Sequence, residues 1–314
     1  MVLLTKIYID MINRYTHNNI TWLDVIQPTL EEIRELIVEC NIPPEFANDL
    51  AVMTPKTEVH AKKGFLKITL DFPIVKRTDI NHPHEIKFLV TKKHLVTIRF
   101  EDIEAIHRFG KEYEVLCMLT SNSKKMASTE TLFVTMLNFL YDAMYAKLDY
   151  IESKLKDIEE EIFNEHEKEM VFELSHMSRR LISFRQTIGA HENALTQLHS
   201  AMITAFTPKS ADRIEELEHH YRSLTRHIYA LMSLHQDLRD ANTALLSTKQ
   251  NEIMKIFTIL AFITFPLTLF TSMFGMNTQA TPIVGGKGDF WIIVAIMAVV
   301  SISFFAFFKY KRWI

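Results

Sequence analysis

The sequence predicts an α+β domain, a long-helix stalk and a C-terminal hairpin of two transmembrane helices, in that order along the chain. Strand and helix patterns alternate in residues 1–124, and residues 125–253 are nearly free of proline and glycine. Residues 254–314 hold two uncharged runs, Ile256–Met276 and Phe290–Phe308. About 20 helical residues cross a bilayer core of roughly 30 Å, so each run is long enough to span a membrane.

The composition excludes several classes of function. The chain has 314 residues, a formal charge of −3 and a pI near 6.5, and nucleic-acid binders are usually strongly basic. Cys40 and Cys117 lack metal-site spacing, so we expect two small buried side chains in a reducing compartment. No nucleophile–base pair, metal cluster or Walker A pattern is legible. The sequence therefore predicts neither an enzyme nor an organic cofactor.

The first part of the α+β domain contains a strand followed by a capped helix. Thr21–Val25 is a strand candidate. Thr29 and Glu32 have capping-box spacing, in which the hydroxyl and the carboxylate bond the free amides of a helix start. The pattern predicts a helix from this point to Glu39.

The rest of the α+β domain is rich in strand patterns. Phe65–Phe72 alternates apolar and polar residues with period two, which is typical of a half-buried strand. Ile86–Val90 and His94–Phe100 are predicted to pair across a short turn.

The stalk begins with a helical stretch from about Ser128 to Ala205. Apolar residues recur there at three-and-four spacing, which predicts antiparallel helix packing: Leu148, Ile151, Leu155, Ile158 and Ile162. Asp149–Glu169 carries nine carboxylates and three lysines. This acidic segment is either a solvated helix-hairpin tip or a surface that attracts cations weakly, and the two interpretations are compatible.

The second half of the stalk continues into the first membrane run. No proline follows Pro208 until Pro266, and the helical apolar pattern is unbroken. We therefore predict one helix from about Ser210 to Phe274, roughly 95 Å long at ~1.5 Å per residue. Pro266 removes a backbone donor within the membrane and is a candidate hinge.

The charges that flank the hairpin predict its orientation. Lysine and arginine favour the cytoplasmic side, and they lie before the first run and after the second, at Lys249, Lys255, Lys309, Lys311 and Arg312. The turn carries only Lys287, and the first residues show no secretory signal. We expect a multi-pass protein of the cell (inner) membrane with both termini in the cytoplasm.

Gly275-Met276-Asn277 ends the first of the two membrane runs. This tripeptide, at this place in a C-terminal hairpin, resembles the signature of the CorA family of divalent-cation transporters. Two shorter patterns are similar to its cytoplasmic domain: Trp-Leu-Asp-Val followed by Pro-Thr-x-Glu-Glu, and Lys-x-x-Leu-Val-Thr. The resemblance covers nearly all of the chain. It implies a homopentamer in a lipid bilayer, a pore lined by the first helix, and magnesium as both transported and regulatory ion.

The pore-lining face is predicted by spacing. One hairpin cannot enclose an aqueous path, so several copies would have to surround an axis. Residues at three-and-four spacing share one side of the long helix and include polar groups: Asp240, Ala244, Ser247, Asn251, Met254, Thr258, Ala261, Phe265, Thr268 and Ser272. We call this set the polar face.

The resemblance also implies apolar gates at Met254, Phe257 and Phe265, with Asn251 and Met254 in an Asn-Glu-x-Met-Lys entry. Phe257 lies about 100° from Thr258 around a helix of 3.6 residues per turn. The sequence leaves open which of the two faces the axis. It also leaves open that the Met and Phe side chains contact lipid or another helix.

The selectivity filter is predicted at Gly275, Met276 and Asn277. Mg²⁺ prefers oxygen ligands and gives up its waters reluctantly, so a ring of Asn277 carboxamides would hold a hydrated ion without gripping it. Gly275 would let backbone carbonyls approach, and Met276 would pack the turn. A helix C-cap role for Asn277 is compatible with this.

The resemblance is incomplete at the turn and implies a regulatory site elsewhere. The loop in the family often carries acidic residues soon after the signature, whereas this one has Asp289 alone, with Lys287 nearby. Affinity and ion preference are therefore open, although Met276 favours the magnesium-type branch over the zinc-type branch. Acidic residues between cytoplasmic domains close family pores when magnesium binds, and the candidates here are Asp79, Glu85, Glu215 and Glu216.

Three functions remain compatible with the sequence. The first is passive magnesium influx driven by the membrane potential and gated by cytoplasmic magnesium. The second is transport of zinc, cobalt or nickel, with proton coupling open. The third is a membrane-anchored coiled-coil sensor or scaffold without a pore, and the polar face and the tripeptide argue against it.

Overall fold

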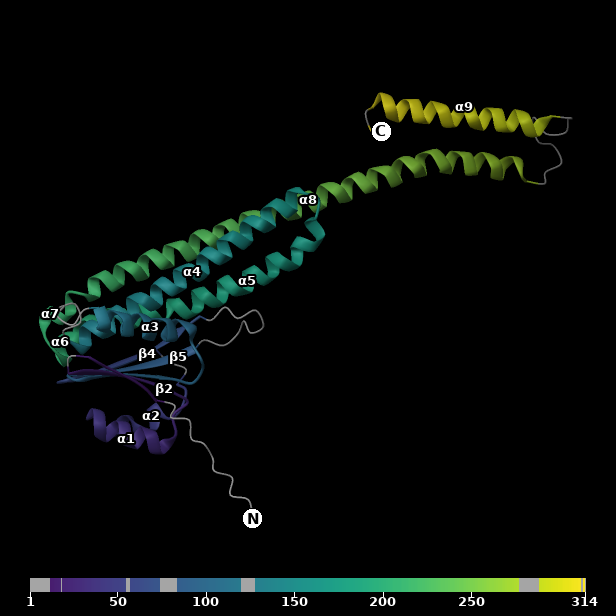
Figure 1. Cartoon of the computed structure of the whole chain (residues 1–314). Coiled ribbons are helices and arrows are strands. Elements are labelled where there is room, and N and C mark those ends of the chain that lie inside the picture. The colour runs from purple at the N-terminus through teal and green to yellow at the C-terminus, as the bar shows by residue number, and fades with distance from the viewer. Residues whose placement is uncertain are drawn as a thin grey trace, which may run out of the picture. The chain divides into compact units, whose positions relative to one another are not determined.

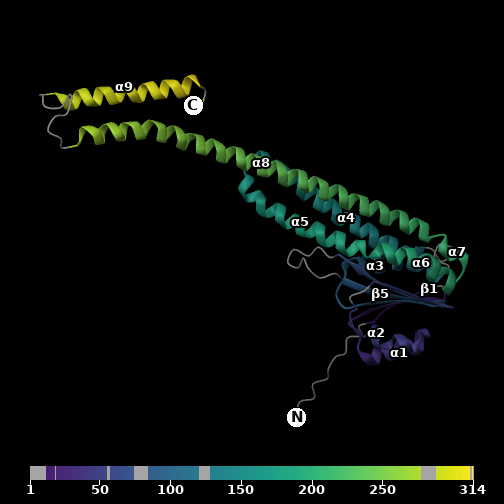
Figure 2. The same ribbon diagram turned by 180° about the vertical axis from the view of Figure 1, so that it is seen from behind.

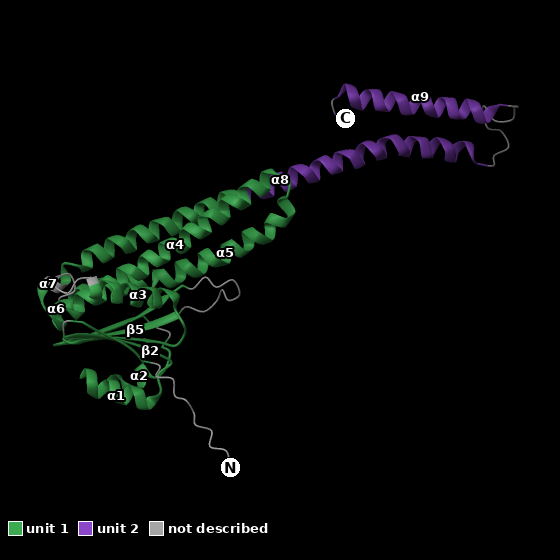
Figure 3. Ribbon diagram, in the orientation of Figure 1, with its two compact units in different colours: residues 1–239 green, residues 240–314 purple. Residues whose placement is uncertain are grey.

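A computed structural model describes residues 12–17, 19–54, 57–73, 84–119, 128–276, 288–311 and 313. The chain divides into two compact units, residues 1–239 and residues 240–314 (Figure 3). The first unit holds the sheet and most of the helices, and the second holds the two apolar helices.

The first unit is built on a mixed six-stranded sheet (Figure 1). The strand order is β1-β2-β6-β5-β4-β3, with β2 and β6 parallel and the other neighbours antiparallel. The strands are β1 (Ile12–His17), β2 (Ile20–Ile26), β3 (Glu58–Lys62), β4 (Phe65–Phe72), β5 (His84–Thr91) and β6 (His94–Arg99). The three predicted segments that form β4, β5 and β6 are confirmed, and β1 and β3 are additional edge strands.

One face of the sheet is covered by α1 (Leu30–Cys40), η1 (Pro44–Phe46) and α2 (Ala47–Leu50). The predicted capping box is present: Thr29 Oγ1 accepts from the Glu32 amide at 3.2 Å, and the Thr29 amide donates to Glu32 Oε2 at 2.7 Å. The apolar side of α1 packs on Leu23, Val25 and other buried side chains of the sheet.

The same face also buries charged groups. Lys67 and Lys87 are buried there and lie beside Asp49 and Glu85. Burial lowers the pKa of Lys67 to about 8 and also lowers the pKa of Lys87. These ammonium groups are held by partners on η1, α2 and β5, which is what a buried charge requires.

The opposite face carries α3 (Glu104–Leu119), α4 (Thr129–Phe163), α5 (Glu167–Gly189) and α6 (His191–Ala205) (Figure 2). Asp24 and Arg99 form a buried pair there, with Arg99 Nη2 donating to Asp24 Oδ2 at 2.9 Å and Nε to Oδ1 at 3.2 Å. Thr97 also donates to Asp24, at 2.9 Å. Both carboxylate oxygens of Asp24 are therefore bonded across β2 and β6.

A second polar link joins this face to the helices above it. Tyr141 on α4 lies 3.0 Å from Nδ1 of the fully buried His191, whose Nε2 lies 2.6 Å from the Asp71 carbonyl oxygen on β4. A neutral imidazole with its proton on Nε2 satisfies both contacts. Burial lowers the pKa of His191 to about 4, and burial together with the nearby Glu85 raises the pKa of Asp71 to about 6.

The stalk helices pack as the spacing predicted. The apolar stripe of α4 is buried along its whole length, and so are most apolar positions of the long helix α8 (Ile214–Phe274) within residues 214–239. The prediction of one helix from Ser210 was wrong at its start. A short α7 (Pro208–Ala211) comes first, and a turn at Asp212 and Arg213 separates it from α8.

The second unit contains the C-terminal part of α8, residues 240–274, and α9 (Asp289–Tyr310). Both helices are long and apolar enough to cross a membrane, and almost none of their apolar surface is buried within the chain. The rings of Phe262 and Phe308 lie 6.2 Å apart between the two helices. The predicted helices of the hairpin thus form, and α8 ends at Phe274 as predicted, two residues before the uncharged run ends at Met276.

Candidate ion pathway

The polar face lies on an unbroken helical segment. Residues 240–274 are helical throughout, including Pro266, so the three-and-four spacing does place the ten positions on one side of α8. α9 packs on a different side, where Ile259 is buried and Phe262 contacts Phe308. At about 100° per residue, Ile259 lies on the order of 100° from Thr258. Phe265, Thr268 and Ser272 of the polar face are exposed. Asn251, Met254 and Thr258, at its N-terminal end, lie beside Lys311 and Trp313, which follow α9.

The threonine hydroxyls of the polar face are bonded within their own helix. Thr258 Oγ1 donates to the Met254 carbonyl at 2.8 Å, and Thr268 Oγ1 donates to the Thr264 carbonyl at 2.9 Å. Each hydroxyl has thus used its one proton, and its oxygen remains as an acceptor. Such oxygens suit the water molecules of a hydrated cation, because those waters turn their hydrogens outward.

The three apolar gate candidates project from the helix without packing inside the chain. Met254, Phe257 and Phe265 are 56%, 60% and 73% exposed. Phe257 lies about 75° around the helix from the centre line of the polar face, whereas Met254 and Phe265 belong to that face. These exposures fit both a pore lining and a lipid contact, so the gate assignment stays a prediction.

A side chain at position 275, at the end of α8, would be in tight contact with the backbone of the preceding turn. The Gly275 amide donates to the Thr271 carbonyl at 2.9 Å, and a Cβ at this position would lie 3.0 Å from that oxygen. Met276 is 59% exposed, so nothing in the described part of the chain packs against most of it. Asn277 lies outside the described residues, and its assignment to the filter remains a prediction.

The four regulatory candidates lie on separate elements. Glu85 is buried on β5, accepts from the Thr54 amide at 2.7 Å and lies 3.2 Å from Lys87 Nζ. Glu215 and Glu216 are exposed in the first turn of α8, where a negative charge favours the helix dipole. Asp79 lies outside the described residues. Within one chain, the described residues do not bring these carboxylates into a shared site.

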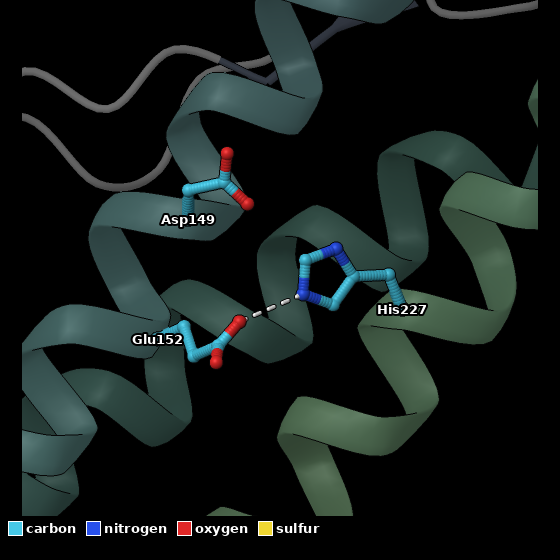
Figure 4. A group of neighbouring side chains, drawn as sticks. All are labelled: Asp149, Glu152 and His227. Carbon is cyan, nitrogen blue, oxygen red and sulfur yellow. Dashed lines mark hydrogen bonds and ion pairs between the residues drawn. The ribbon is translucent and has the colours of Figure 1, made fainter.

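The structure instead brings together three side chains that the sequence patterns did not connect. Asp149 and Glu152 on α4 face His227 on α8, with their potential ligand atoms all within 4.8 Å of one another (Figure 4). Glu152 already accepts from Lys156 at 2.8 Å and lies 3.2 Å from His227 Nε2. The hydrogen bond to Lys156, followed by the one to His227, holds the pKa of Glu152 below its ordinary value. The cluster is thus explained as a helix–helix contact without an ion. Glu152 and His227 are 75 residues apart in the chain, so no local pattern signals the contact.

Comparisons with known proteins agree with the tripeptide and the fold. A family model described as CorA-like Mg2+ transporter protein matches residues 17–312. A cobalt/magnesium transport protein CorA of Methanocaldococcus jannaschii is 23% identical over 300 residues, covering 93% of this chain and 91% of that protein. Its namesake from Thermotoga maritima is 26% identical over 183 residues, covering 58% of this chain and about half, 52%, of that protein.

A solved structure supports the same assignment for the fold. The complete structure of the CorA magnesium transporter from Methanocaldococcus jannaschii matches with a TM-score of 0.81 at 20% identity, covering 96% of this chain and 93% of that chain. The expected fold is therefore confirmed, from the α/β unit through the long helix to the two apolar helices. With a family match across nearly the whole chain, the protein belongs to the CorA family of divalent-cation transporters.

Proposed function

We propose that this chain is the subunit of a homopentameric, channel-like magnesium transporter of the cell membrane, with both termini in the cytoplasm. The observation that carries the proposal is the polar face of α8, which is free of α9 and leads to Gly275-Met276-Asn277. Two helices cannot surround an aqueous path alone, so the face requires copies of the same chain around an axis.

The proposed path conducts Mg²⁺ with its waters. The membrane segments of α8 and α9 carry no charged side chain between Ile256 and Met276 or between Phe290 and Phe308. Neutral acceptors, the Thr258 and Thr268 hydroxyls and the Asn277 carboxamide, hold the hydration shell and release it easily, whereas a carboxylate ring would bind the ion more tightly.

The energy for influx is proposed to be the membrane potential. Moving a divalent ion inward across 100 mV releases about 4.6 kcal/mol, and neither a Walker A pattern nor an organic cofactor is part of the proposal. Rings of Met254 and Phe265 offer no ligand to an ion and would close the path by excluding water. Cytoplasmic Mg²⁺ bound between neighbouring subunits, with Glu215, Glu216, Asp79 and Glu85 as candidates, would favour the closed state.

A second candidate is transport of cobalt, zinc or nickel by the same path. Both relatives described above carry the name cobalt/magnesium transport protein, and the turn has a single acidic residue, Asp289, which leaves the ion preference open. Proton coupling belongs to this alternative.

The test is ion uptake by the full-length protein in liposomes with an inside-negative potential. Magnesium, cobalt and zinc are measured separately, for the wild type and for Asn277→Ala. We expect magnesium entry that scales with the potential and falls at least tenfold in the variant. Entry of cobalt or zinc alone would favour the second candidate. No entry of any ion from a verified folded oligomer would overturn both and leave a scaffold without a pore.

A further inference from the structure

Two adjoining hollows lie where the membrane helices meet the chain's basic end. One has a volume of about 540 Å³ and is lined by Asn251, Met254, Lys255, Thr258, Lys311 and Trp313. The other has a volume of about 500 Å³ and is lined by Glu252, Lys255, Ile256, Ile259 and Trp313. Lys255 and Trp313 line both, so the two hollows flank the same side chains within the second unit. One hollow is the more polar, and the other has an isoleucine wall.

The indole of Trp313 is held in place between them. Its backbone amide donates to the Phe308 carbonyl at 2.9 Å, and its ring stacks on Phe308 with centroids 5.8 Å apart. Phe308 in turn contacts Phe262 on α8. The chain therefore folds back after α9 and places an amphipathic ring against the end of the membrane segment, the depth at which tryptophan is enriched.

The charges of the described side chains that line the hollows do not balance one another. Neither Lys255 nor Lys311 has an ion pair or a hydrogen bond from its ammonium group within the described residues. Glu252 is the one carboxylate among the side chains that line the two hollows. Two ammonium groups and one carboxylate leave one net positive charge, which a single phosphodiester would neutralise.

The position of the hollows relative to the membrane indicates that this phosphodiester belongs to a phospholipid. Lys255 immediately precedes the uncharged run that starts at Ile256, and Lys309 and Lys311 follow the run that ends at Phe308. Both lysines of the first hollow thus lie at one boundary between hydrocarbon and water, where phospholipid head groups are concentrated. The isoleucine wall of the second hollow lies on the membrane side of Lys255 and suits the start of an acyl chain.

We propose that these hollows form a binding site for an anionic phospholipid. Lys255 and Lys311 contact its phosphate, Trp313 packs beside its glycerol, and the exposed Ile256 contacts an acyl chain. Because Asn251, Met254 and Thr258 of the polar face line the same hollow, a bound head group would also cancel positive charge close to that face. The binding itself does not depend on the proposed function, since lipid occupancy is measured without ion flux.

The experiment measures quenching of Trp313 fluorescence by brominated lipids in the full-length protein. The chain has three tryptophans, of which Trp22 is fully buried in the sheet unit, and Trp291→Phe removes the other one in α9. Phosphatidylcholine vesicles contain brominated phosphatidylglycerol or, in parallel, brominated phosphatidylcholine. A lysine near an anionic head group contributes about a fivefold gain in affinity, so we expect phosphatidylglycerol to be preferred by at least tenfold.

Variants separate the site from general charge attraction. Lys255→Gln and Lys311→Gln should each lower the preference about fivefold and together abolish it, while the matched control Lys309→Gln, which does not line either hollow, should keep it. Equal quenching by the two lipids would overturn the proposal, and it is the result expected if a second subunit fills the hollows. A preference that survives in the double variant would also overturn it. Displacement by millimolar glycerophosphoglycerol would show a soluble phosphate site instead of a lipid site.

Discussion

Buried polar groups of the sheet and hydroxyls on the surface of the membrane helix find their hydrogen-bond partners in different places. In the sheet unit, a buried polar group finds its partner on another element, as Arg99 on β6 does with Asp24 on β2. In the second unit, the threonines of α8 bond to carbonyls one turn back in the same helix. The first arrangement fixes elements against one another, and the second leaves the helix surface available to something outside the chain.

This difference indicates which unit is complete by itself. The sheet unit has a large buried apolar core, and its buried Lys67, Lys87 and Arg99 have carboxylate partners, so most of its stability is decided within one chain. The second unit exposes nearly all of its apolar surface, so lipid and other copies must cover it. Mutations should therefore affect stability in the first unit and transport or lipid contact in the second.

The largest loss of stability is expected when the buried ion pair of Asp24 and Arg99 is broken. Asp24→Ala leaves the Arg99 guanidinium buried with only part of its partners, which should cost about 3–5 kcal/mol. Guanidinium chloride unfolding followed by near-ultraviolet circular dichroism measures the loss. The control is Glu39→Ala, which breaks the exposed Arg14–Glu39 pair and should cost less than about 1 kcal/mol. Equal losses of stability in the two variants would contradict the expectation that a buried ion pair costs more to break than an exposed one.

The next largest effect is expected in the pH dependence of the unfolding free energy, to which His191 and Asp71 make opposing contributions. The pKa of His191 falls from 6.5 to about 4 on folding, so its contribution is present above pH 6.5 and is lost as the pH falls toward 4. The pKa of Asp71 rises from 3.8 to about 6, so its contribution is present below pH 3.8 and is lost as the pH rises through 6. Each shift corresponds to about 3 kcal/mol, and the two oppose each other.

Single substitutions should separate these two contributions. Relative to the wild type, His191→Gln should gain stability as the pH falls from 6.5 to 4, because only Asp71 then titrates. Asp71→Asn should lose stability over the same range. Unfolding free energies at pH 4, 5 and 6.5 provide the measurement. If the unfolding free energies of both variants changed with pH in the same way as that of the wild type, His191 and Asp71 would not be the source of the pH dependence.

A smaller effect is expected at the start of α1. Thr29→Ala removes the hydroxyl that accepts from the Glu32 amide and should cost about 1 kcal/mol. Ser200→Ala serves as the control, because that hydroxyl bonds a carbonyl inside α6 and alanine is the better helix former. Thermal unfolding should rank the two variants in this order. A Ser200→Ala loss as large as that of Thr29→Ala would contradict the capping argument.

The smallest stability effect, with the sharpest functional contrast, is expected on α8. Thr258 and Thr264 donate to carbonyls four residues back at 2.8 and 2.7 Å, but they lie about 120° apart around the helix. Thr258→Val and Thr264→Val should each change stability by less than about 0.5 kcal/mol. Thr258→Val removes one hydrogen-bond acceptor from the polar face, which is worth about 1 kcal/mol, so magnesium uptake should fall about fivefold. Thr264→Val removes no acceptor from that face and should leave uptake unchanged. Equal uptake in both would argue against the polar face as the ion path.

The helices and strands that could be predicted from the sequence are those marked by a local pattern, either a regular spacing of apolar residues or a capping motif. The alternation of Phe65–Phe72, the capping box at Thr29 and the apolar stripe of α4 are local and strong, and all three appear in the structure. The two edge strands were missed because they are short and mostly half-buried, which leaves no clear alternation. The turn at Asp212 and Arg213 was missed because neither glycine nor proline marks it.

In the candidate site too, local spacing could be read from the sequence, but contacts between distant parts of the chain could not. The polar face needs only helical periodicity, so it could be derived from residue spacing. Glu85 could be recognised as acidic, but its contacts with Lys87 and with the Thr54 amide depend on the pairing of strands and the path of a loop. The Asp149–Glu152–His227 cluster depends on the packing of α4 against α8, for which one sequence gives no register.

The parallel pairing of β2 with β6 has a consequence for biosynthesis. Thr21 pairs with His94, so the centre of the sheet cannot close until β6 has left the ribosome. The first membrane run begins only at Ile256, 157 residues after Arg99. At 5–20 residues per second, the sheet has roughly 8 to 30 s to fold before a hydrophobic span emerges. The order of elements thus lets a slow, long-range sheet form in water before the ribosome is drawn to the membrane.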